Sequence, residues 1–76
     1  MSVHYQILVS WDSEADLWVT HVPALDISTY GETRERAIDA TREAILGYIE
    51  ATDKEGLPLP SMPQRSELVD IEVARA

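Results

Sequence analysis

The stretch TYGETRERA, residues 29–37, separates two different hydrophobic patterns. Before it, apolar and polar side chains alternate, as in a strand with one buried face. After it, apolar residues recur every three or four positions, as in a helix that packs along one side. Gly31 allows backbone angles that other residues resist, and Thr33 is a suitable helix N-cap. The stretch therefore predicts the end of a sheet and the start of a helix.

Upstream, two β-rich runs separated by the polar turn DSEAD predict an antiparallel hairpin over residues 3–22. A loop at residues 13–16 places Trp11 opposite Trp18. A register shifted by one residue stays open, because the run LWVTHV is apolar on both sides. The break PALD and a short strand over residues 27–30 follow.

Downstream, the helical pattern predicts a helix over residues 34–54, with Gly56 as its left-handed stop. Closely spaced prolines predict a stiff, extended connector over residues 56–63. The alternating run ELVDIEVA predicts a last strand over residues 67–74. The order β-β-β-α-β describes a single α+β domain over residues 1–76, a small antiparallel sheet with one helix on one face.

One helix leaves the other face of this sheet open. A chain of 76 residues buries only ~60% of the surface that its unfolded form exposes, so its core is marginal. The open face is expected to carry Leu8, Leu17 and Val19, which makes self-association favourable. The sequence therefore predicts a homo-oligomer, a dimer or higher, with these side chains as the candidate interface. The alternative is that they pack under the C-terminal strand or the connector.

The composition is acidic, with 14 Asp and Glu against 6 Lys and Arg, a net charge of -8. Direct nucleic-acid binding is not expected, because it depends on neutralising phosphates with basic side chains. A basic protein partner would be attracted by this charge, although acidity also simply keeps a small protein in solution. Leu46, among charged neighbours, is a further candidate contact. The candidate partner-binding acids are Asp12, Glu14, Asp16, Asp39, Glu43 and Glu50.

No catalytic or metal site is predicted, and no cofactor is expected. The turn DSEAD imitates the start of a calcium loop, but Leu17 stands where that loop requires glycine. In the predicted register His4 and His21 lie about 13 Å apart, too far to share a metal ion. The chain contains neither a nucleophile elbow nor a phosphate-binding glycine loop.

The compartment is expected to be the cytoplasm. Cysteine is absent, which fits a reducing environment. The N-terminal sequence MSVHYQILVSW has no basic region followed by an apolar run, as a signal peptide would. No stretch approaches the length of an apolar membrane span, so no membrane association is expected.

A longer pattern is carried by five fragments in order: YQILV, WVTHVPAL, YGETRERAI, AILGYIEA and GLPLP. Over about residues 3–60 this pattern resembles the N-terminal domain of the HicB-like antitoxin family. The resemblance implies a partial ribonuclease-H-like layout without catalytic carboxylates. It also implies a partner, a small basic toxin called HicA that resembles a double-stranded-RNA-binding domain and cleaves mRNA. Masking of such a toxin is the expected function.

The chain departs from the family pattern in three places. Residues 26–28 read Asp-Ile-Ser where Pro-Gly-Cys is frequent, and Arg36 stands where Glu usually precedes the helix alanine. The sequence also ends without the usual DNA-binding domain; if it is complete, the family's role as a repressor does not carry over. An orphan oligomeric binding module of the same fold is therefore the alternative function. A residual nuclease is a third hypothesis, with a few acids as candidates: Asp12, Asp16, Asp26 and Glu32.

Overall fold

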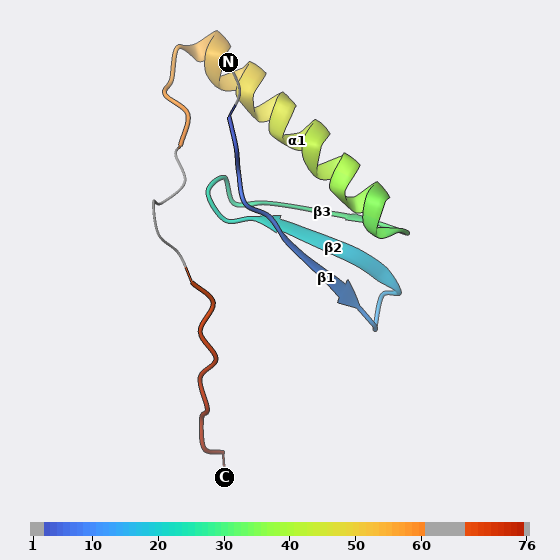
Figure 1. The fold of residues 1–76 in the computed structure, drawn as a ribbon. Helices are drawn as coiled ribbons and strands as arrows, with labels where there is room; N and C mark the ends of the chain where they lie inside the picture. The colour runs from blue at the N-terminus through green and yellow to red at the C-terminus, as the bar shows by residue number, and fades with distance from the viewer. Residues whose placement is uncertain (1–2, 61–66, 76) are drawn as a thin grey trace.

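The computed structural model describes residues 3–60 and 67–75. Three strands form an antiparallel sheet in the order β1-β2-β3, and one helix, α1, lies across one face of it (Figure 1). This is the predicted α+β layout as far as the helix. The elements are β1 (Leu8–Asp12), β2 (Leu17–Val22), β3 (Ile27–Gly31) and α1 (Arg34–Glu55).

The predicted hairpin register is confirmed. Trp11 of β1 pairs with Trp18 of β2, and Leu8 pairs with His21. The two indole rings meet edge to face, with centroids 5.6 Å apart and planes at 63°, the arrangement that aromatic quadrupoles favour. Since side chains alternate along a strand, this register fixes which residues face α1.

Thr33 caps the helix as predicted. It has extended backbone angles, φ -121° and ψ 160°, and its hydroxyl accepts a hydrogen bond from the Arg36 amide at 3.1 Å. At the other end Gly56 adopts the left-handed conformation, φ 70° and ψ 23°, which confirms the predicted stop. Its amide bonds to the Asp53 carbonyl at 3.2 Å. The helix ends at Glu55, one residue beyond the prediction.

The reason given for Gly31 was wrong. Gly31 does not have a positive φ; among the glycines in the described part of the chain, only Gly56 does. What Gly31 provides is space, because a Cβ atom built there would lie 2.5 Å from the Ala37 amide nitrogen and 2.9 Å from the Arg36 carbonyl carbon. The backbones of β3 and α1 therefore approach each other at a point where only glycine fits.

The core lies between α1 and the two strands on which it mainly packs, β2 and β3. Among the described residues, the buried apolar side chains are Val22, Leu25 and Ala37. Buried beside them are Thr20 and Thr41, each 1% exposed. So few buried apolar groups agree with the marginal core expected of a short chain.

The hairpin is shorter than the predicted span of 3–22. β1 begins only at Leu8, and residues 3–7 form no strand. The strand pairing explains why β1 starts so late. Its partner β2 ends at Val22, because the next residue, Pro23, has no amide hydrogen to donate to a neighbouring strand. Residues N-terminal to β1 therefore extend past the end of β2 and have no strand beside them there.

The last strand, predicted over 67–74, is not formed within this chain. Residues 67–75 carry no strand and lead away from the sheet (Figure 1). The alternating pattern specifies which side chains share a face, but a strand also needs an edge to pair with. Of the predicted connector, residues 56–60 are described and contain no strand, while residues 61–63 lie outside the described residues.

Candidate partner-binding surfaces

The acids of the hairpin tip are exposed, and two of them serve the turn. The Asp12 carboxylate accepts hydrogen bonds from the backbone amides of Glu14, at 3.0 Å, and Ala15, at 3.2 Å. Asp16 has a φ of 55°, a left-handed conformation that aspartate tolerates better than most residues. Asp12 and Asp16 therefore stabilise the turn conformation. The side chain of Glu14 makes no such contribution to the turn.

The helix acids form a separate group, the acidic stripe, which consists of Asp39, Glu43 and Glu50. At 100° per residue the three fall within an arc of about 40°, on the side of α1 opposite its buried residues. Leu46, 53% exposed, borders the same arc. Asp39 also pairs with Arg42 at 3.0 Å, although both side chains stay exposed to water.

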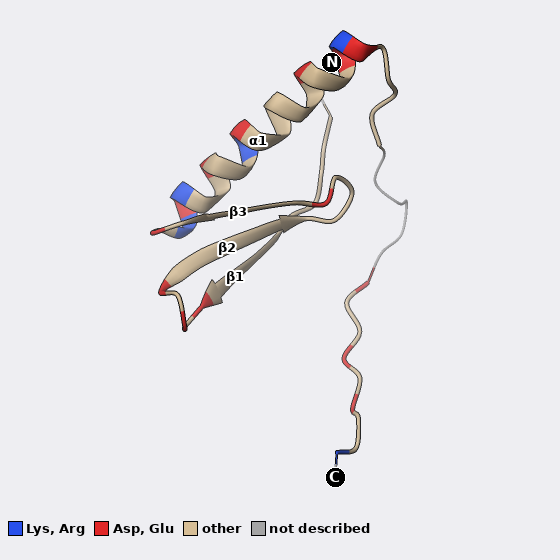
Figure 2. Ribbon diagram, turned by 180° about the vertical axis from the view of Figure 1, so that it is seen from behind, with Lys and Arg blue, Asp and Glu red and all other residues tan. Residues whose placement is uncertain are grey.

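The structure does not bring the six predicted acids into one surface. Acidic residues occur both at the free end of the hairpin and along α1, which are separate parts of the domain (Figure 2). The pairing of Trp18 with Gly31 places the tip at the end of the sheet where α1 begins. Two basic residues, Arg34 and Arg36, stand at that end, so its charge is mixed. The stripe also has a basic neighbour, Arg42, which pairs with Asp39.

The three residues of the predicted oligomer interface share the open face, as expected from the register. Thr20 points toward α1, so its neighbours in β2 point the other way. Leu8 is 43% exposed, while Leu17 and Val19 are half-buried. Polar groups interrupt this face, because His21 lies opposite Leu8 and bonds through Nδ1 to the Ser28 hydroxyl at 2.9 Å. The open face is thus apolar only in part.

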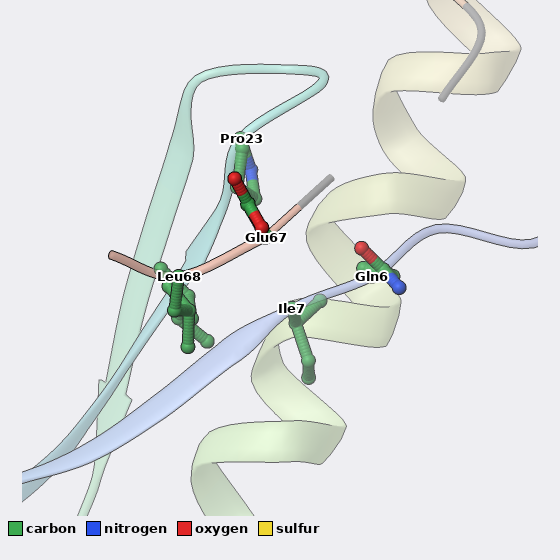
Figure 3. Close-up of a pocket in the computed structure, with 6 residues that line it drawn as sticks. Gln6, Ile7, Pro23, Glu67 and Leu68 are labelled. Carbon is green, nitrogen blue, oxygen red and sulfur yellow. The ribbon is translucent and has the colours of Figure 1, made fainter. Parts of the chain in front are cut away.

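Two hollows lie near the start of β1. Neither was predicted from the sequence, because residues 3–7 were assigned to the hairpin. The larger, about 660 Å³, contains side chains from distant parts of the chain, including Gln6, Pro23 and Leu68 (Figure 3). The smaller, about 260 Å³, lies between the N-terminal segment and α1. A hydrogen bond from the Tyr5 hydroxyl to the Pro60 carbonyl, 2.8 Å long, ties the connector to this side of the domain.

A cluster of threonine hydroxyls joins two strands of the sheet, β2 and β3, to the helix α1. The Thr20 hydroxyl bonds to Thr29, at 2.6 Å, and to Thr41. Thr41 also bonds to Thr29 at 2.8 Å and to the Ala37 carbonyl at 2.8 Å. Every hydroxyl is satisfied inside the protein. The cluster thus fastens β2, β3 and α1 together, and it was not predicted because its members are far apart in sequence.

The acids of the nuclease hypothesis do not converge. Asp16 precedes β2 and Asp26 follows it, so the six residues of that strand separate them by roughly 20 Å. Glu32 lies at the end of the sheet near Asp16, and all of these residues are exposed. In the described part of the chain, no group of three or more His, Asp or Glu residues is arranged to hold a metal ion.

No helix in the described ranges is long and apolar enough to cross a membrane. Comparison of the chain with protein-family models, with curated proteins and with solved structures found no significant match.

Proposed function

We propose that this chain is an antitoxin-type protein-binding domain that masks a small basic toxin similar to HicA. The observation that carries the proposal is the acidic stripe of α1, where Asp39, Glu43 and Glu50 line up away from the sheet. The strand-strand-strand-helix layout agrees with the resemblance from which this function was expected.

The mechanism is steric and electrostatic masking. A net charge of -8 accelerates encounter with a basic partner and favours the orientation in which the stripe faces it. Leu46 gives the stripe an apolar neighbour, and a central apolar contact surrounded by charges is a common arrangement in interfaces. A toxin whose RNA-binding surface is covered in this way cannot hold RNA.

The test is co-purification of this protein from its own cells at low and at high salt. A small basic protein should be captured at low salt and released as salt screens the charges. The stripe variant Asp39→Asn, Glu43→Gln, Glu50→Gln should bind this partner about 3- to 150-fold more weakly, since three exposed ion pairs contribute about 0.2–1 kcal/mol each. The control variant Asp26→Asn, Glu32→Gln, Glu55→Gln removes the same charge elsewhere and should bind nearly as well as the wild type. Equal weakening in both variants would refute a specific role for the stripe.

The alternative is an orphan oligomeric binding module of the same fold. The observation that favours it is the exposure of Leu68, Val69, Ile71 and Val73, which range from 67% to 86% exposed. This alternative predicts stable self-association and no basic partner in the eluate at any salt concentration.

A further inference from the structure

The C-terminal segment, residues 67–75, has the pattern of a strand but no strand partner. Val69, Ile71 and Val73 alternate with polar residues, and they are 67%, 80% and 77% exposed. The chain has a radius of gyration of 15.1 Å, whereas a compact domain of its length has about 11 Å. Residues 67–75 therefore have the pattern of a half-buried strand but are exposed to solvent.

A matching edge is present on the sheet. In the order β1-β2-β3, β1 has a strand on one side only, so its outer edge is open to another strand. Beside that edge lies the smaller hollow, between the N-terminal segment and α1. Its walls are largely apolar and include Val3, Tyr5, Ile7, Ile38, Ile45 and Ile49. A strand added along residues 5–10 would point every second side chain toward α1, and those level with Tyr5 and Ile7 would enter the hollow.

We propose that this edge is occupied by the C-terminal segment of a second copy of the chain. Each copy would donate its segment and receive the other's, in a reciprocal dimer with two-fold symmetry. Glu67 and Leu68 line the larger hollow together with Ile7 and Pro23, so the segment starts near the first residue of β1 (Figure 3). From there it runs away from its own sheet and outward (Figure 1), where a second copy can receive it.

The area available is that of a stable dimer. Four large apolar side chains of the segment are exposed: Leu68, Val69, Ile71 and Val73. Burying each removes roughly 100 Å² from water, so two exchanged segments remove about 800 Å². The receiving edges lose a similar area, and the total of about 1,600 Å² is typical of specific protein interfaces. This interface uses the edge of the sheet and is distinct from the open face of Leu8, Leu17 and Val19.

Engineered disulfides test the exchange, because the natural chain contains no cysteine. With the segment parallel to the chain before and within β1 and Ile71 level with Ile7, which lines the hollow, Ala74 lies level with Ser10, and both of these residues are exposed. The double variant Ser10→Cys, Ala74→Cys should therefore form a covalent dimer on mild oxidation. The control Ser28→Cys, Ala74→Cys places the first thiol on β3, beyond β2, and should form no such bond.

The proposal fails if the double variant gives a bond within one chain, which would place the segment on its own sheet. It also fails if the wild type sediments as a monomer. Two single variants separate this interface from the open face by their mass in solution. Ile71→Lys should dissociate the dimer, whereas Val19→Lys should leave it intact. The reverse result would assign the interface to the open face and overturn the exchange.

Discussion

Replacement of Gly31 by alanine should destabilise the protein strongly. The added Cβ would lie 2.5 Å from the Ala37 nitrogen, 2.9 Å from the Arg36 carbonyl carbon and 3.0 Å from the Ala37 Cα. All three are backbone atoms, so no side chain can rotate away, and the start of α1 must move off β3. Overpacking of this kind costs about 1–3 kcal/mol, and rigid neighbours place Gly31→Ala at about 3 kcal/mol. A domain of 76 residues has only about 4–11 kcal/mol in total.

Two other glycines supply matched controls for the same substitution. Gly47 lies inside α1 with nothing within 4 Å of the added Cβ, so Gly47→Ala should stabilise the protein by about 0.5–1 kcal/mol. Gly56 has equally free space but a φ of 70°, so Gly56→Ala should cost about 1–2 kcal/mol through backbone strain alone. Thermal unfolding should place the variants in the order Gly47→Ala, wild type, Gly56→Ala, Gly31→Ala. Gly31→Ala as stable as the wild type would refute the close approach of β3 and α1.

Three further substitutions test the remaining local contacts by thermal unfolding. Thr33→Ala removes the cap of α1 and should lower the free energy of unfolding by about 1 kcal/mol, or the melting temperature by about 4–8 °C. Thr33→Ser keeps the hydroxyl that accepts from the Arg36 amide and should retain most of the stability. An equal loss of stability in both variants would contradict the cap. Thr41→Val removes a hydroxyl shared with Thr20 and Thr29, and should cost about 1–3 kcal/mol; no change would show that the cluster is dispensable. Asp12→Ala leaves two backbone amides of the turn without their acceptor, and should lower the free energy of unfolding by about 0.5–1.5 kcal/mol. Asp12→Asn should lower it less, since the side-chain amide oxygen of asparagine can still accept these hydrogen bonds.

Local signals were sufficient for much of the fold. The loop at residues 13–16 predicted the observed pairing of Trp11 with Trp18, although the run LWVTHV, apolar on both sides, left a shift by one residue open. Thr33 and Gly56 marked the helix ends through chemistry that acts within a few residues. The acidic stripe could likewise be placed on the outer side of the helix, since the spacing of its members alone determines their direction.

The features that the sequence did not reveal depend on contacts between distant segments. Gly31 is required by the position of the helix backbone above it, which no local pattern encodes. The threonine cluster joins Thr20 to Thr41, 21 residues apart. The predicted strand over 67–74 failed for the same reason: its alternating pattern states what the strand would bury but not which edge receives it.

The two proposed surfaces meet at Leu46. This residue lines the hollow beside β1 together with Ile45 and Ile49, and it also borders the acidic stripe on the outer side of α1. A strand exchanged into the hollow would pack against one side of Leu46, while a partner on the stripe would contact the other, so both can be bound at once. Packing by the strand would also restrict the side-chain rotamers of Leu46 before the partner arrives, which lowers the entropy cost of that second contact. Dimerisation and partner binding should therefore reinforce each other, and Leu46→Ala should weaken that coupling more than it weakens either interaction alone.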